Sequence, residues 1–513
     1  MNLRHTVIPF PNRQSETAMS VLHFFGRRIV ALAVVLVATL PLGAGAQSSA
    51  AQSPQAISLA EAMLMAVKVS HTVRTAEAGV LRSQGQQMQA RAQYLPQIMG
   101  SAQYQRTIQS QFQALSKSTG SDTTKSSGSG SSSSSSSSVG DISKIFAAPN
   151  TVTLGLSLSQ NLFTAGKLTA STKSAEASRA VADIGLLSAR AQLALTVAQA
   201  YYDAVASEQL VQIADSTLAQ TERTLQQTTI SRQVGSSAEF DLLRARVTRD
   251  NQRPVVIQAR GTRDIAMLRL RQLLGIPLQQ QIALTTPIHD DGTPGVESQP
   301  VQLSQPINNP GAANGIVPDT TVGNRASVRQ AEANLTAQEY ALKAANWNRL
   351  PSVQLTSNYQ RFGYPPDGTF LPNSFSQFYP NWTAAVGMSI PVFLGGKLTG
   401  DRMIAEANVN DARQTLLQTR ELAELDARTA ITQLDQTQAA YAASVGTDQQ
   451  AARAYAIAEV RYREGISTQV ELEQSRTQYQ QARLYRVQAA RDLEVARLKV
   501  ALLKDLPLST IGR

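Results

Sequence analysis

The chain has 513 residues, a formal net charge of +10 and no cysteine. Without cysteine it can form no disulfide, carry no lipid on an N-terminal cysteine and build no thiolate metal site. The positive charge is spread along the chain without a basic cluster interleaved with aromatic residues, so we predict no nucleic-acid partner. The sequence shows no glycine-rich phosphate loop, nucleophile elbow or ligand-spaced histidine pair, so we expect neither an enzyme nor a cofactor.

Residues 1–46 have the pattern of a secretory signal peptide. Arg27-Arg28 precede an apolar run over 29–42, and small residues follow up to Ala46, where we expect cleavage. The run is shorter than the ~20 residues that a membrane span needs, so a transmembrane anchor is the less favoured alternative. Translation could start at Met1 or at Met19.

Beyond the signal, the same motifs occur twice. Val73-Arg74-Thr75-Ala76-Glu77-Ala78 returns 255 residues later as Val328-Arg329-Gln330-Ala331-Glu332-Ala333. Phe163-x-x-Gly166-Lys167 returns 230 residues later as Phe393-x-x-Gly396-Lys397. Such self-similarity is the mark of a duplicated structural unit.

The two copies divide the mature chain. We predict a first repeat over 47–277, a second over 324–507 and a short tail over 508–513. The segment 278–323, rich in proline, asparagine and glutamine, joins them as an irregular belt around the middle of the helices. The offset falls from 255 to 230, so the first copy has 25 more residues, and the Ser-rich tract 112–150 lies there. Such a tract cannot bury a core, and we expect an exposed, solvated loop.

Each repeat contains one very long predicted helix. Residues 168–234 and 398–464 contain no proline, and apolar residues recur along them at alternating steps of four and three, the coiled-coil pattern. At ~1.5 Å per residue each would be about 100 Å long. Return helices are predicted over 236–276 and 466–506.

Glycines mark the turns between the long and return helices. Gly235 and Gly465 follow the long helices, and glycine favours the left-handed conformation that ends a helix. Ser236 and Thr468 each stand three residues before a glutamate, the spacing of a capping box, so we expect them to open the return helices.

Around the Ser-rich tract and at its counterpart the period changes to two. Apolar residues alternate with small polar ones over about 97–111, 151–163, 352–364 and 381–393, as in the strands of a membrane barrel. Aromatic residues that would suit a girdle at the bilayer surface gather in the second copy, at Tyr364, Phe370, Phe375, Phe378, Tyr379 and Trp382. Amphipathic hairpins packed on a soluble core are the alternative.

Four strands cannot close a barrel, and an open sheet edge in lipid leaves backbone groups without partners. Two chains would supply eight strands, too few for a conduit, whereas three would supply twelve. The expected fold is therefore mainly α with membrane β. A duplicated helix-strand-strand-helix unit builds a long α-helical coiled-coil tunnel, and four strands per chain complete a 12-stranded β-barrel in a homotrimer.

These motifs resemble those of the TolC-like outer-membrane efflux proteins, over roughly 59–507. The marks are Val-Arg-x-Ala-Glu-Ala, Leu-Pro before each first strand, Phe-x-x-Gly-Lys after each second strand, and the glycine turns, the first followed by Asp241-Leu242-Leu243. The resemblance implies a homotrimer in outer-membrane lipid that extends into the periplasm. It also implies two partners, a periplasmic adaptor (membrane fusion) protein and an inner-membrane pump or ABC exporter.

In that family, polar links between helices near the tips close the periplasmic aperture. Carried over by position, the resemblance implies gate roles for Asp241, Tyr462 and Glu471. An arginine often found two residues after the second glycine is Ser467 here, so part of that network is missing or rearranged. Acids in a first helical turn also favour the helix dipole, and a tyrosine can simply pack in the seam.

The tip residues are our candidates for adaptor contact, although capping alone explains most of their types: Gly235, Ser236, Gly465 and Ile466. The resulting hypothesis is a passive outer-membrane exit duct of a tripartite efflux or type I secretion system. An exported coiled-coil stalk or adhesin without a channel is the alternative. A wide aqueous duct has no selective pocket, so the sequence does not indicate whether drugs, metals or proteins are exported.

Overall fold

The computed structural model describes residues 55–108, 150–288, 321–365, 369 and 374–508, all in one compact unit, Pro54–Arg513. The predicted signal peptide and nearly all of the Ser-rich loop lie outside these residues. So do most of the segment between the repeats and most of the C-terminal tail.

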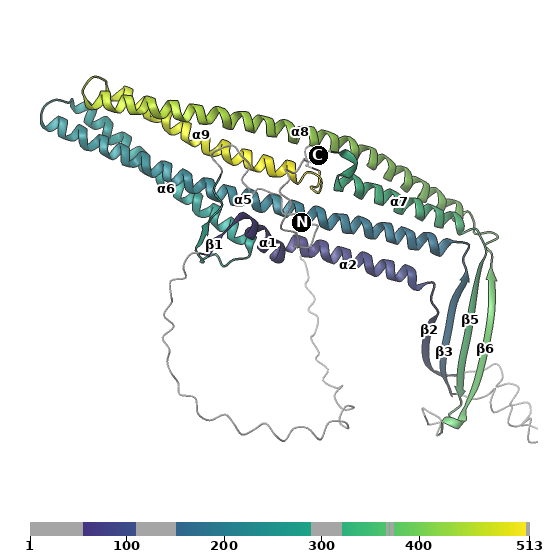
Figure 1. Cartoon of the computed structure of the whole chain (residues 1–513). Coiled ribbons are helices and arrows are strands. Elements are labelled where there is room, and N and C mark those ends of the chain that lie inside the picture. The colour runs from purple at the N-terminus through teal and green to yellow at the C-terminus, as the bar shows by residue number, and fades with distance from the viewer. Residues whose placement is uncertain (1–54, 109–149, 289–320, 366–368, 370–373, 509–513) are drawn as a thin grey trace, which may run out of the picture. The chain divides into compact units, whose positions relative to one another are not determined.

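Two helices of 67 residues each dominate this unit (Figure 1). Helix α5 spans Lys167–Gln233, compared with the predicted 168–234, and α8 spans Lys397–Arg463, compared with 398–464. Both begin after a glycine in the left-handed region, Gly166 or Gly396. A stretch of α5 is apolar enough to cross a membrane by length and composition, and 33% of that stretch is buried inside the chain. Helix α5 packs against α2, α6, α7 and α9.

Shorter helices pair with these two. Helices α2 (His71–Ala92) and α7 (Ala326–Trp347) precede the strands, and α1 (Leu59–Val69) precedes α2. The return helices α6 (Glu239–Leu274) and α9 (Gln469–Ala501) run back along α5 and α8. Both begin three residues later than predicted, because the turn after each glycine first completes the end of the long helix.

The strands form one antiparallel sheet in the order β2-β3-β5-β6, visible at the lower right of Figure 1. Its members are β2 (Gln97–Arg106), β3 (Asn150–Phe163), β5 (Ser352–Gly363) and β6 (Phe378–Ser389). Strand β2 ends at Arg106 although the sequence predicts a strand to 111, and residues 109–111 lie outside the described residues. The predicted strand 381–393 is displaced toward the C-terminus relative to β6. Strands β2 and β6 are the edges of this sheet.

The two faces of the sheet differ in polarity. The register places Gly100, Leu156, Tyr359 and Trp382 in one cross-strand row, and the next row along β2, on the other face, is Ser101, Gly155, Gln360 and Asn381. Cross-strand neighbours share a face, so one face is apolar and the other polar. The apolar face is exposed in the single chain, including Leu156, Trp382, Val386 and Met388.

The main hydrophobic core lies around the middle of α5, against α1 and the ends of α6 and α9. Tyr201 of α5 is fully buried there, and its hydroxyl donates to the carbonyl of Ile57 at 3.0 Å and accepts from the N–H of Thr286 at 2.9 Å. A small parallel pair, β1 (Gln55–Ile57) with β4 (Ile282–Leu284), is thereby tied to the long helix.

A second tie, on α8, is a buried ion pair. The guanidinium of Arg325 is completely buried and lies 2.6 Å from Asp426 Oδ2, and it also donates to the carbonyl of Ala423 at 2.9 Å. Arg325 occupies the N-cap position of α7, so this pair fixes the start of α7 on α8. Removing one partner of a buried pair leaves a charge without compensation.

We expect Asp426→Ala to destabilise the protein by about 3–5 kcal/mol, because Arg325 would keep its charge in a buried site. Thermal unfolding of the purified protein in detergent measures the change. Glu424→Ala on the same helix is the matched control, because its pair with Arg428 is exposed and should contribute at most about 1 kcal/mol. Equal effects of the two variants would contradict a structural role for the buried pair.

Candidate functional site at the hairpin tips

The helices form two hairpins, α5 with α6 and α8 with α9, and each turns at a glycine (Figure 1, upper left). In the first, Gly235 has a φ of 79°, and the N–H and hydroxyl of Ser236 both donate to the carbonyl of Ser231, at 2.9 and 3.0 Å. Ser236 therefore caps the end of α5. The N-cap of α6 is Ala238, which makes no side-chain capping bond, so the predicted capping box at Ser236 is wrong.

The second turn has the same backbone conformation and a different start to its return helix. Gly465 has a φ of 74°, and the N–H of Ile466 donates to the carbonyl of Arg461 at 2.8 Å. Thr468 is the N-cap of α9, and its hydroxyl accepts from the N–H of Glu471 at 3.4 Å, as expected. The carboxylate of Glu471 lies 3.3 Å from Arg461, within the same hairpin.

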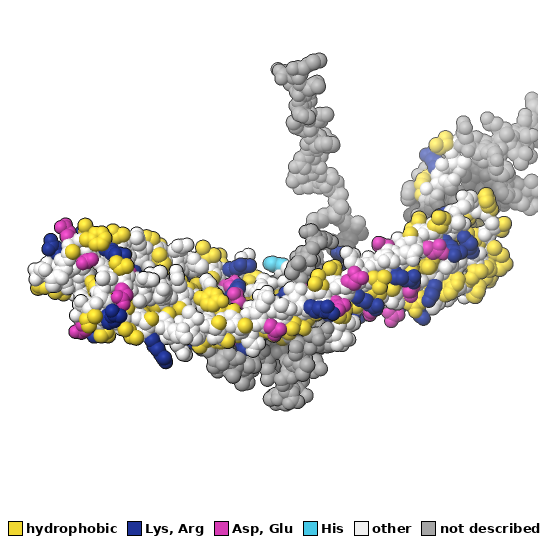
Figure 2. All heavy atoms as spheres, turned by 90° about the horizontal axis from the view of Figure 1, so that it is seen from above, with side chains coloured by type: hydrophobic (Ala, Val, Ile, Leu, Met, Phe, Trp, Pro, Cys, Tyr) yellow, Lys and Arg dark blue, Asp and Glu magenta, His cyan; other side chains and the backbone are white. Residues whose placement is uncertain are grey.

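The outermost residues of both turns face solvent in the single chain. Gly235, Ser236 and Gly465 are exposed, and Ile466 is 69% exposed. Val234 beside Gly235 is 73% exposed. Figure 2 shows hydrophobic side chains among charges of both signs at the end where the hairpins turn. Such a mixed surface can hold a protein partner through apolar contacts and orient it through charge.

Behind the turns, a carboxylate on α9 connects the two hairpins. Glu473 accepts from Arg244 Nε at 3.2 Å through one oxygen and from the hydroxyl of Thr248 at 2.8 Å through the other. Both donors lie on α6. The side chain of Glu473 is 17% exposed, so this charge-assisted contact is partly shielded from solvent.

Two further polar contacts cross between the hairpins. The side-chain amide of Gln469 is buried against the start of α6. In the amide orientation that satisfies both of its atoms, it donates to the carbonyl of Asp241 at 3.0 Å and accepts from the N–H of Ala245 at 3.3 Å. The hydroxyls of Tyr462 on α8 and Thr228 on α5 are 3.2 Å apart. Polar contacts between α6 and α9 and between α5 and α8 therefore join the hairpins near their tips.

An aromatic cluster supports this network. Tyr462 packs beside Tyr455, Leu472 and Tyr479, and the rings of Tyr455 and Tyr479 stack with centroids 5.8 Å apart. Burial, assisted by the nearby Glu459, raises the pKa of Tyr455, so its phenol remains neutral over the physiological range. The cluster is therefore a neutral support beside the charged Glu473 contact.

The structure places the three gate candidates differently. Tyr462 crosses between the hairpins through its side chain. The carboxylate of Asp241 accepts from Ser237 at 3.4 Å, and only its backbone carbonyl reaches the other hairpin. Glu471 pairs within its own hairpin. The position carrying the bridging carboxylate in the second copy, Glu473, corresponds to a leucine 230 residues earlier, so a comparison of the copies does not single it out.

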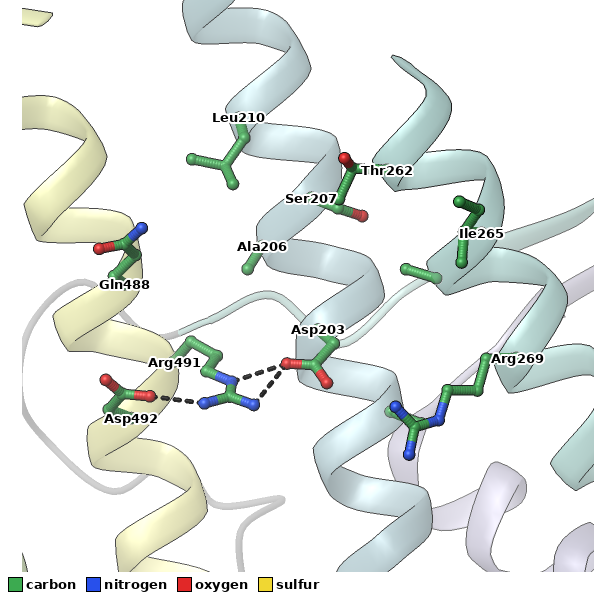
Figure 3. Close-up of a pocket in the computed structure, with 12 residues that line it drawn as sticks. Asp203, Ala206, Ser207, Leu210, Thr262, Ile265, Arg269, Gln488, Arg491 and Asp492 are labelled. Carbon is green, nitrogen blue, oxygen red and sulfur yellow. Dashed lines mark hydrogen bonds and ion pairs between the residues drawn. The ribbon is translucent and has the colours of Figure 1, made fainter. Parts of the chain in front are cut away.

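Farther from the tips, a cavity of about 500 Å³ opens between α5, α6 and α9 (Figure 3). Arg491 lies in it, 2.6 Å from Asp203 Oδ1 and 2.6 Å from Asp492 Oδ1. Burial lowers the pKa of Arg491, but its hydrogen bonds to Asp492 and Asp203 outweigh that effect and raise it. Arg491 thus ties α9 to α5. Among the described residues, no group of three or more histidine, aspartate and glutamate side chains could hold a metal.

Comparison with known proteins gives a consistent picture. The family model "outer membrane efflux protein" matches residues 65–276 and 317–503. A pyoverdine export outer membrane protein of Pseudomonas putida, OpmQ, is 25% identical over 308 residues, 58% of this chain and 59% of that protein. The toluene efflux pump outer membrane protein TtgF of the same species is 28% identical over 226 residues, 43% of this chain and 42% of that protein. These alignments span less than two thirds of either relative.

Solved structures share the fold over most of its length. A membrane protein from Pseudomonas aeruginosa superposes with a TM-score of 0.66 at 17% identity, covering 87% of this chain and 93% of that one. The outer membrane protein VceC of Vibrio cholerae gives a TM-score of 0.64 at 17% identity, covering 88% of this chain and 97% of that one. The family match extends over most of the chain, and the chain belongs to the outer membrane efflux protein family.

Proposed function

We propose that the protein is the exit duct of a tripartite export system, which passes cargo from a periplasmic adaptor and an inner-membrane pump or exporter to the exterior. The observation that carries this proposal is the joining of an apolar-faced sheet with two open edges to a pair of 67-residue helices. The sheet suits lipid, and the helices are long enough to extend far from the bilayer. A stalk without a channel would need no such sheet.

The proposed channel is a homotrimer of duplicated units. The element order α2-β2-β3-α5-α6 is followed by α7-β5-β6-α8-α9, which supports the duplication. Three chains would bring twelve β-strands to a barrel. Each chain would also bring two long helices and two lines of shorter helices to a tunnel. The open edges at β2 and β6 would then be paired between chains. Its lumen would be lined by the polar face of the sheet. The duct itself is passive, and the partner pump supplies the energy.

The closed state of the tunnel is held by the contacts that join the hairpins at their tips. Tyr462 and Asp241 contribute as described, and Glu471 steadies the second turn through Arg461. The Glu473 contact with Arg244 and Thr248 adds the charged connection that the sequence did not indicate. Opening would separate the hairpins at these contacts. The exposed turn residues Gly235, Ser236, Gly465 and Ile466 would meet the adaptor.

The first test of this proposal is electrical. We expect the double variant Tyr462→Phe/Glu473→Gln to raise single-channel conductance or open probability in planar bilayers. It removes contacts worth about 1–3 kcal/mol per chain, a shift of about fivefold or more toward the open state. Asp241→Asn/Glu471→Gln tests the two other acids in the same assay, with a smaller expected effect because neither carboxylate crosses between the hairpins.

Glu464→Gln is the matched control for these variants. It removes a carboxylate from the second turn, where Glu464 lies 3.6 Å from the adjacent Arg463, an exposed pair within one hairpin. Its conductance should equal that of the unmodified protein. An unchanged conductance for Tyr462→Phe/Glu473→Gln in a channel of normal abundance would remove these contacts from the gate.

The second test concerns the adaptor. We expect Ile466→Asp to reduce crosslinking in cells to the co-purifying adaptor at least several-fold, because a charge replaces an exposed apolar contact at the tip. Ile466→Val keeps the apolar surface and should bind as before. Crosslinked partners identified by mass spectrometry give the readout. Equal capture by both variants would place the adaptor contact elsewhere.

A further inference from the structure

We propose that the open edge of β6 pairs with β2 of a second copy in one fixed antiparallel register, with Met388 opposite Ala102 of the partner subunit. The proposal rests on the trimer proposed above and adds the pairing between its subunits. It follows from the two offsets, 255 and 230, that relate the halves of the chain.

The offsets already convert one observed hairpin into the other. In the first hairpin Gln97 pairs with Ser159. Moving these positions by 255 and 230 gives Ser352 and Ser389, which are paired in the second hairpin. The other end behaves alike, because Arg106 with Asn150 becomes Arg361 with Pro380. The register of one half thus predicts the register of the other.

The same relation holds among the helices. Arg190 on α5 lies 3.2 Å from Glu77 on α2. The corresponding positions, Arg420 on α8 and Glu332 on α7, lie 2.7 Å apart. The packing of each short helix on its long helix is therefore repeated in both halves at this point. The offset is 255 for elements before the Ser-rich tract and 230 for elements after it.

Within one chain, β3 of the first half pairs with β5 of the second half, and Leu158 is opposite Ser357. In a closed ring of alternating halves, the second half must meet the first half of the next chain in the same way. Moving Leu158 forward by 230 gives Met388, and moving Ser357 back by 255 gives Ala102. The paired segments are 384–389 of one chain and 101–106 of the next, in antiparallel order.

The polarity of the two edges agrees with this register. Met388 is 66% exposed and shares the apolar face of the sheet with Val386, and Ala102 lies on that face of β2. The alternate residues, Ser389 and Ser101 of the partner subunit, would meet on the polar face. A slip by one residue would place Met388 opposite a polar neighbour and mix the faces along the whole seam.

The end of β6 at Ser389, four residues before the predicted end, also points to a missing neighbouring strand. Strand β3 continues past the end of its pairing with β2 through residues 160–163, of which 160, 161 and 163 pair with β5 of the other half. Their counterparts, 390–393, have no such neighbour within a single chain, so β6 ends at Ser389 although the sequence predicts a strand to 393. Pro391 occupies the position of Asn161, where β3 has a bulge, and bulges and edges are where strands accept proline.

Helix α8 lacks the corresponding neighbours. Leu195 of α5 is 7% exposed, whereas its counterpart Leu425 on α8 is 57% exposed. Helix α5 packs against α7 and α9 of the other half. By the same conversion, α8 would receive α2 and α6 of the partner subunit, which would cover Leu425. The sheet and the helices therefore indicate the same missing neighbour.

The test uses the absence of native cysteine. The double variant Ala102→Cys/Met388→Cys, expressed as the full chain in cells and oxidised mildly, should shift from one-chain to three-chain mass in denaturing gels and return on reduction. Leu158→Cys/Ser357→Cys is the matched positive control, because it occupies the equivalent pair within one chain and should form an intrachain disulfide, read as loss of free thiols without a mass change.

Two variants displaced by two residues test the register itself. Gly100→Cys/Met388→Cys and Tyr104→Cys/Met388→Cys keep both thiols on the same face but set them on diagonals of about 7–8 Å, beyond good disulfide geometry. They should remain largely at one-chain mass. Added cysteine at Gly100 has room, because a Cβ there would meet only Leu156, at 3.8 Å.

The outcomes separate the two proposals when the uncrosslinked mass in detergent is measured in parallel. The register is overturned, and the trimer is not, if the three-chain protein crosslinks best through one of the displaced cysteine pairs. The same holds if no intersubunit pair crosslinks while the intrachain control forms its disulfide. A one-chain mass for the unmodified protein overturns both. Preferential three-chain crosslinking of Ala102→Cys/Met388→Cys supports both.

Discussion

Unpaired backbone at the two edges of the sheet is the constraint on which the rest of the arrangement depends. Strands β2 and β6 each offer a row of N–H and C=O groups along one side. In water such groups are solvated, but beside the exposed apolar face they would have to be satisfied without water. The chain cannot bend its own sheet of four strands into a closed wall, so a neighbour with the complementary edge is required.

The turns between the sheet and the long helices fix the direction of the helices relative to the sheet. Each long helix follows a strand after a short connection, residues 164–166 between β3 and α5 and residues 390–396 between β6 and α8, and begins after a glycine in the left-handed region. At Gly166 an added Cβ would come within 2.7 Å of the Trp347 ring, so the turn has space for nothing larger than hydrogen. The direction of α5 is thereby fixed against the sheet. Helices joined to neighbouring strands pack side by side, as α5 and α7 do beyond β3 and β5.

Periodic features of this fold can be predicted from sequence, whereas its specific polar contacts cannot. The steps of four and three along 168–234 predict α5 to within one residue, because only a continuous α-helix keeps apolar residues at that spacing on one side. The start of α6 is missed because Ser236 has the side chain of an N-cap but bonds backward to Ser231. Local spacing does not distinguish these two uses of a serine.

The tip network shows the same division. Tyr462 is indicated by the family resemblance, counted back from Gly465, and its hydroxyl lies 3.2 Å from that of Thr228 on the other hairpin. Glu473 is missed because its partners, Arg244 and Thr248, are more than 200 positions away and belong to the other half of the chain. Contacts of this kind depend on which faces of two hairpins meet, and no single-chain periodicity encodes that choice.

The polar contacts between the two hairpins have no copies at the corresponding positions. Asp203 and Arg491 correspond to Gln433 and Gly261, and Arg244 and Glu473 to Gln474 and Leu243. In the proposed trimer, boundaries between the two hairpins of one chain, which carry these ion pairs, would alternate with boundaries between chains, which lack them. Such a ring would dilate with threefold rather than sixfold symmetry, because the two kinds of boundary would resist separation by different amounts.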